Sequence, residues 1–148
     1  TTNGTWLFAA TGTEVIYLIG QMPHAWKEGS TISPHVHWYK STSAAGDVKW
    51  QLDYKMFPIG EVGASSFTTL TVSEPVEGTP DTDTALMHMI SSFGDVDMTG
   101  YGLSDCIIMK VSRLGDDAAD TYAADAALME FDIHMQLDSF GSDQEFIK

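Results

Sequence analysis

The sequence is poor in three features that would each point to a class of protein: cysteine, basic side chains and long apolar runs. Its one cysteine, Cys106, excludes an internal disulfide, and the apolar run at residues 106–109 predicts a buried structural thiol. Lysine and arginine number 7 against 21 aspartates and glutamates, a net charge of −14. This balance disfavours binding to nucleic acid or to an anionic membrane surface.

No apolar run approaches the roughly 18 to 20 residues that a membrane-spanning helix needs, so no membrane segment is expected. The first residues lack the basic leader and the long apolar block of a signal peptide, and none is predicted there. Apolar residues make up 43% of the 148 residues, which is typical of a globular protein. We therefore expect one domain over residues 1–148, with residues 1–12 as an arm or edge segment.

Apolar and polar residues alternate along much of the chain, which is typical of half-buried β-strands. The clearest case is residues 48–56, whose apolar face is Val48, Trp50, Leu52, Tyr54 and Met56. In residues 128–137 the same pattern puts Met129, Phe131, Ile133, Met135 and Leu137 inward. The other predicted strands are residues 6–9, 14–21, 32–40, 66–72, 86–92 and 106–113.

Glycine, proline and aspartate clusters separate these segments and indicate turns. Short strands joined by such loops predict an all-β fold, a two-sheet antiparallel β-sandwich of the jelly-roll type. Little helix is expected, with helical turns only within residues 82–90 and 118–127.

Two histidines at alternate positions, His35 and His37, point to the same side of their predicted strand. With Gly29 they resemble the beginning of the first cupin metal motif, but the glutamate of that motif is missing, since Ser41 and Thr42 stand in its place. We predict a structural or intersubunit role for both. The alternative is a metal site, which His35, His37, Asp132 and His134 would form if their two strands were neighbours. His24 and His88 have no partner at ligand spacing.

Two further candidates come from loops. Four carboxylates, Asp116, Asp117, Asp120 and Asp125, lie within ten residues, and calcium prefers such oxygen ligands. Their spacing does not match an EF-hand, so we favour a solvated turn in which aspartates cap backbone amides. Trp26 lies in a loop-like segment, and we expect it to be partly exposed and available for contact with a ligand or a partner.

Enzyme signatures are lacking. The sequence has no nucleophile elbow, phosphate loop, dinucleotide fingerprint or cysteine cluster. We therefore predict no catalytic residues, no enzyme activity and no cofactor.

Several blocks of the sequence resemble a family of small virion proteins of tailed bacteriophages. They are residues 21–29, 34–38, 46–54, 112–117, 120–122, 130–134 and 141–142. The resemblance implies a phage structural protein with a jelly-roll domain, located in the virion, and it brings no catalytic residues. Our first expectation is a homotrimeric head decoration or cement protein whose partners are its own copies and phage capsid or tail proteins. The alternatives are a tail-fibre domain that binds a host glycan through Trp26, and a cupin-like metalloprotein.

Overall fold

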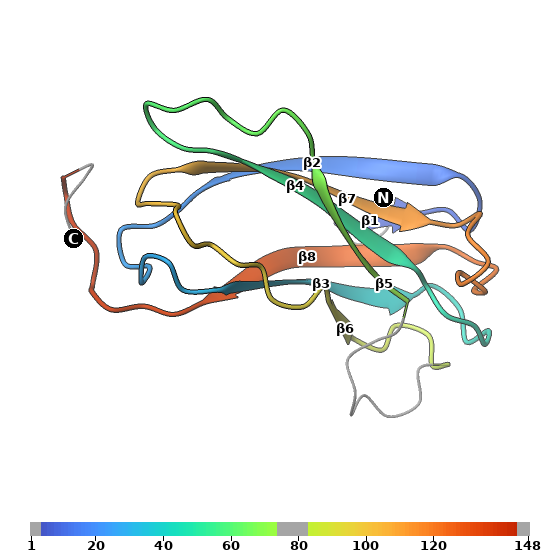
Figure 1. The fold of residues 1–148 in the computed structure, drawn as a ribbon. Helices are drawn as coiled ribbons and strands as arrows, with labels where there is room; N and C mark the ends of the chain where they lie inside the picture. The colour runs from blue at the N-terminus through green and yellow to red at the C-terminus, as the bar shows by residue number, and fades with distance from the viewer. Residues whose placement is uncertain (1–3, 74–82, 145–148) are drawn as a thin grey trace.

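A computed structural model describes residues 4–73 and 83–144 of the chain. These residues form eight β-strands in two four-stranded antiparallel sheets that pack face to face (Figure 1). The strands are β1 (Trp6–Phe8), β2 (Thr13–Gln21), β3 (Ile32–Lys40), β4 (Trp50–Phe57), β5 (Thr68–Val72), β6 (Met89–Ser92), β7 (Cys106–Leu114) and β8 (Ala126–Met135). All eight segments predicted as strands are confirmed, with ends shifted by at most a few residues.

The strand order makes this sandwich a jelly roll. One sheet, sheet A, has the order β1-β8-β3-β6, and the other, sheet B, has the order β2-β7-β4-β5. The first strand therefore pairs with the last, the second with the seventh, the third with the sixth and the fourth with the fifth, all antiparallel. This is the arrangement of one long hairpin folded over on itself into two sheets.

No helix occurs within residues 4–73 and 83–144, so the expected helical turns are absent from residues 83–90 and 118–127. Residue 82, also part of the first prediction, lies outside the described residues. It follows that the described part of the chain offers no helix that could cross a membrane.

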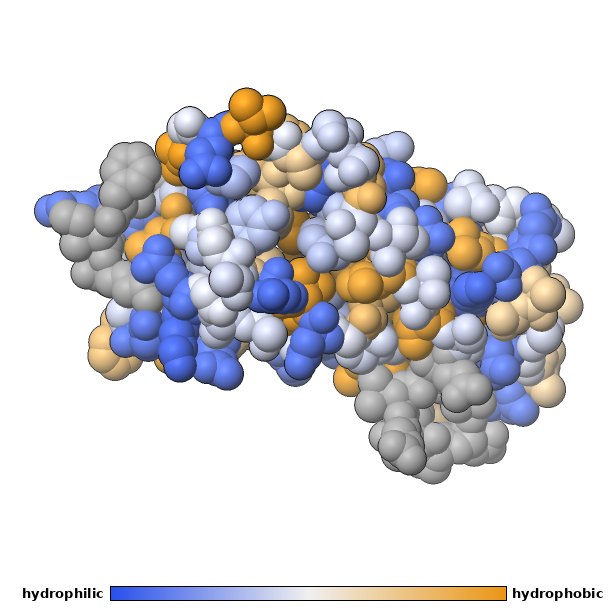
Figure 2. All heavy atoms as spheres, in the orientation of Figure 1, coloured by the Kyte–Doolittle hydropathy of each residue, from blue (hydrophilic) through white to orange (hydrophobic). Residues whose placement is uncertain are grey.

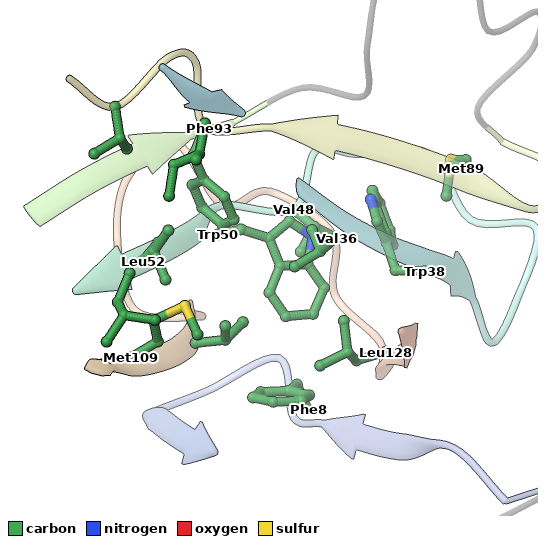
Figure 3. Close-up of a cluster of buried hydrophobic side chains, with 14 of the residues drawn as sticks. Phe8, Val36, Trp38, Val48, Trp50, Leu52, Met89, Phe93, Met109 and Leu128 are labelled. Atoms are coloured by element: carbon green, nitrogen blue, oxygen red, sulfur yellow. The ribbon is translucent and has the colours of Figure 1, made fainter. Parts of the chain in front are cut away.

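Aromatic side chains from both sheets meet in the core. Trp50 of sheet B is fully buried and lies edge-on to Phe8 and Trp38 of sheet A, with ring centroids 5.2 and 5.8 Å apart. Figure 3 shows these rings together with Leu128 and Met109 around the same point. Edge-to-face contacts at these distances are favourable beyond the area that they bury. The predicted apolar face of residues 48–56 is thus confirmed as the centre of the core.

The inward face of β8 changes phase along the strand. Ala126 and Leu128 are fully buried, whereas Phe131 and Ile133 are the later residues that pack on the core. The pairing with β3 shifts between His37 and Trp38, so that β8 carries an extra residue, a β-bulge, at this point. Leu137, predicted to point inward, lies beyond the strand and is 62% exposed, so that prediction is wrong.

Cys106 was also predicted wrongly, because it is exposed. It begins β7, in which Ile107, Met109 and Val111 face the core and the alternate positions face outward. In the sequence, the polar residues Lys110 and Ser112 at alternate positions indicate which side of this strand faces outward. The run of apolar residues at 106–109 does not alternate, so it gave the wrong prediction for Cys106.

Candidate functional site

A cluster of histidines and one aspartate lies on the outer face of sheet A. Neighbouring strands β3 and β8 supply its centre, because His35 is paired with Asp132 and Ser33 with His134. Val36 and Trp38 of β3 point into the core, so His35 and His37 point away from it. The sequence left the adjacency of these two strands open, and the structure establishes it.

Asp132 lies between two imidazole rings. Its Oδ1 is 2.8 Å from Nε2 of His35, and its Oδ2 is 3.5 Å from Nε2 of His37. His134 completes the centre, since its ring centroid is 4.4 Å from that of His35. One potential ligand atom from each of His35, Asp132 and His134 lies within 4.8 Å of the other two.

The cluster extends to β6 through His88, which we predicted to have no partner. That prediction is wrong, because Nδ1 of His37 is 2.7 Å from Nε2 of His88. Trp38 pairs with Met89, and Met89 points into the core, so His88 precedes it on the outer face. The alternation of residues 88–92 is enough to place the side chain of His88 on the outer face. The pairing of β6 with β3, which decides its neighbour, was not visible in the sequence.

The hydrogen bonds around His35 and Asp132 are incomplete. His35 is only 5% exposed, and its Nδ1 is 3.3 Å from the carbonyl oxygen of Ser33, which can only accept. Oδ1 of Asp132 and Nε2 of His37 are buried and have no hydrogen-bond partner. No ring N–H is therefore directed at Oδ1, although Nε2 of His35 lies close to it. Buried polar atoms without a partner are uncommon and destabilising.

This set of side chains has the composition of a transition-metal site. Two imidazoles and a carboxylate suit zinc and neighbouring divalent metals. The alternative metal set named from the sequence, His35, His37, Asp132 and His134, thus comes together in one place, with His88 added.

Trp26 does not fit the predicted role of a partly exposed contact residue. It is 0% exposed and belongs to the core, where its strand-like pairing with Leu137 and the bond from Lys27 N to the Gln136 carbonyl hold its segment against the end of β8. The segment looks like a loop in the sequence because the pairing that buries it comes from the other end of the chain.

The acidic loop after β7 is organised by internal contacts. Both carboxylate oxygens of Asp120 accept hydrogen bonds from Arg113, at 2.8 and 2.9 Å, and the two side chains are 1% and 0% exposed. Asp117 accepts from Lys49 Nζ and from the backbone N–H of Ala119. The Lys49 bond is the first cause, and the Ala119 bond the second, that holds the pKa of Asp117 below its ordinary value.

Asp116 and Asp125 of that loop remain exposed. Two of the four calcium candidates are therefore used by the fold, and the interpretation of the loop as a structural turn accounts for their contacts. Asp120 explains why an arginine is tolerated inside the sandwich, because a bidentate pair neutralises the buried guanidinium.

Comparisons with protein-family models, with curated proteins and with solved structures give no match for this chain.

Proposed function

We propose that this chain is a structural protein of a bacteriophage virion, a capsid decoration protein that assembles as a homotrimer and reinforces the seams between capsid subunits. The resemblance of its sequence blocks to small phage virion proteins supports this proposal. So does the jelly-roll topology, which recurs in capsid domains. Both arguments concern the type of protein. A surface feature carries the argument for assembly.

That feature is an apolar stripe on β2, defined as Val15, Tyr17 and Ile19. These side chains are 39%, 70% and 76% exposed and follow one another on the outer face of an edge strand of sheet B. In Figure 1, β2 runs along one margin of the sandwich. The stripe adjoins Ile108 of β7, which pairs with Ile19. Contiguous exposed apolar groups on an edge strand indicate a surface that contacts another protein.

The charge of this face favours a second copy of the same chain as the partner. Among the outward positions of the four strands of sheet B, all of which the structure describes, Asp53 alone carries a carboxylate. It is buried and paired with Lys110, and Lys55 lies on the same face. For a chain with a net charge of −14, a face with a single, paired carboxylate allows two copies to approach with little repulsion.

The surface elsewhere is mixed. In the view of Figure 2, hydrophobic groups stand in several separate places among hydrophilic residues. Scattered apolar residues of this kind are normal for a globular surface. The stripe on β2 differs because its three members are consecutive outward positions of one strand.

The alternative of a glycan-binding tail-fibre domain loses its proposed contact residue, because Trp26 is inside the core. The cupin-like alternative would place a reaction between the sheets. His35 and His37 face away from that space, which aromatic and aliphatic side chains fill. The decoration protein remains the function that we propose.

The first test measures oligomeric state by size-exclusion chromatography with light scattering at micromolar concentration. We expect three times the chain mass of 16.1 kDa, and one chain mass for the double variant Tyr17→Ser with Ile19→Ser. Val62→Ser is the matched control, since Val62 is 97% exposed but lies in the loop between β4 and β5. A monomeric wild type, or a double variant that keeps the trimer mass, would contradict the assembly.

The second test asks where the trimer binds. Purified protein is mixed with phage heads stripped of the protein and, separately, with host cell envelopes. We expect saturable binding to the heads and a higher temperature of head disruption, because a ligand that binds only the assembled shell stabilises it by mass action. Binding to envelopes alone would replace the decoration role with an adhesive one.

A further inference from the structure

We propose that His35, Asp132 and His134 bind one divalent transition-metal ion, with Zn²⁺ as the representative ion, on the outer face of sheet A. This site is separate from the apolar stripe of sheet B, so it stands or falls independently of the proposed function. The ligands are one carboxylate oxygen and two imidazole nitrogens, the donor types of three-ligand zinc sites. All three side chains come from two paired strands, which hold them at fixed spacing.

The close contact between His35 and the buried Oδ1 of Asp132 gives the strongest argument. The Ser33 carbonyl oxygen can only accept, so Nδ1 of His35 carries the proton that points toward it at 3.3 Å. In the neutral ring, Nε2 then has a lone pair, and it lies 2.8 Å from Oδ1 of Asp132 with no hydrogen bond between them. Two acceptors at this distance repel each other unless a cation lies next to both or the ring takes a second proton.

A metal ion satisfies both His35 and Oδ1 of Asp132. A histidine that binds a metal commonly donates its other ring N–H to a backbone carbonyl, which is the arrangement of His35 and Ser33. The buried Oδ1 of Asp132, which has no hydrogen-bond partner, would become a ligand. Bonds of about 2.0–2.1 Å in a tetrahedral site put ligand atoms about 3.3 Å apart. The observed separations, from 2.8 Å up to 4.8 Å, bracket this value.

His134 is the ligand that can adjust. It is exposed, whereas His35 is buried, so its ring can rotate toward the ion without disturbing the core. It also borders a shallow depression that Ser33, Asp95 and Gln136 help to line. Three protein ligands leave a fourth position of a tetrahedral ion for water or an outside group, and the depression gives that position access from solvent.

His37 and His88 act as positioning residues in this proposal. Nε2 of His37 lies 3.5 Å from Oδ2, the carboxylate oxygen that does not face His35, and Nδ1 of His37 is 2.7 Å from His88. Nε2 of His37 makes no hydrogen bond as it stands, and it would close on Oδ2 and fix the orientation of the carboxylate once Oδ1 holds the ion. Loss of an outer-shell partner of this kind costs about 10- to 100-fold in metal affinity.

The experiment is titration of the full chain with ZnCl₂ after dialysis against a chelator, followed by isothermal calorimetry and by elemental analysis of the desalted protein. We expect one Zn²⁺ per chain and a higher unfolding temperature in its presence. Asp132→Asn and His134→Ala should each weaken binding by about 100-fold or more, and His88→Ala by about 10-fold. His24→Ala is the matched control, because His24 binds Ser104 outside the cluster and its loss should change affinity less than about twofold.

His134→Ala keeps the test decisive if a variant of a buried residue fails to fold, since His134 is exposed. Absence of saturable Zn²⁺ binding at millimolar concentration would overturn the proposal. So would binding that Asp132→Asn and His134→Ala leave unchanged. Nitrogen NMR that finds both ring nitrogens of His35 protonated in the presence of Zn²⁺ would assign the contact to an imidazolium–carboxylate pair and would likewise overturn it.

Discussion

Asp53 and Asp132 occupy equivalent places on the two sheets and have opposite surroundings. Each is an aspartate at an outward position of a strand. Asp53 lies on β4, between β5 and β7, and Asp132 lies on β8, opposite His35 of β3. Asp53 accepts hydrogen bonds from Thr69 at 2.5 Å and Gln51 at 3.0 Å, and its Oδ2 is 2.9 Å from Lys110 Nζ. Burial raises its pKa, but the hydrogen bonds from Thr69, Lys110 and Gln51 together hold the pKa below its ordinary value.

Asp132 has imidazole rings in place of these donors. Its nearest nitrogens belong to His35 and His37, and its Oδ1 has no hydrogen-bond partner. The comparison indicates that an outward carboxylate on a sheet either accepts hydrogen bonds from neighbouring side chains or stays available to a ligand. Which of the two applies depends on the donors that the neighbouring strands supply, and these two aspartates are the test of that rule.

The largest effect on stability is expected at Asp120, because both oxygens of its buried carboxylate accept hydrogen bonds from Arg113. Asp120→Asn leaves the Arg113 guanidinium buried without a counter-charge, so we expect a loss of about 3–5 kcal/mol in the free energy of unfolding. Urea denaturation measures this loss. Asp116→Asn in the same loop is the control and should change stability by less than about 0.5 kcal/mol, because Asp116 is exposed. Equal effects of the two variants would contradict the structural role of the buried pair.

The central comparison is Asp53→Asn against Asp132→Asn in metal-free protein. Asp53→Asn removes the charge that pairs with Lys110 and replaces one acceptor oxygen by an N–H donor, so it should cost about 1–3 kcal/mol in the free energy of unfolding. Asp132→Asn places an amide N–H donor opposite the Nε2 lone pair of His35. We therefore expect a change within about 0.5 kcal/mol, or a gain. If denaturation in chelator instead shows an equal loss for Asp132→Asn, the carboxylate is already paired with a protonated ring, and the comparison fails.

The smallest expected effect is a dependence on pH. The folded-state pKa of Asp53 is lowered from 3.8, so its contribution to stability is complete well above pH 3.8 and is lost as the pH falls through the folded-state pKa. The stability difference between wild type and Asp53→Asn should consequently shrink on acidification from pH 6 toward pH 3. Denaturation curves at several pH values measure this difference. A gap that widens in acid would contradict the assigned direction.

Much of the fold could be predicted from local pattern. Alternation in residues 48–56 identified the face that holds Trp50 and Leu52, and all eight strand segments were found this way. Predictions were wrong where a residue's surroundings come from a distant part of the chain. Trp26 is buried by its pairing with Leu137, and His88 gains His37 through the pairing of β6 with β3. The burial of Cys106 was predicted wrongly, although the alternation along the rest of β7 places this residue on the outer face.

By itself, the sequence determined that the chain forms alternating strands with a two-layer core and an acidic surface, because side-chain direction in a strand has a period of two and charge is a sum over residues. Only the tertiary structure decided that His35 meets Asp132 and that Val15, Tyr17 and Ile19 lie on an open edge. Strand order and register join residues that are far apart in the chain. A repeating local pattern fixes the face on which a side chain lies, but it carries no information about the strand beside it.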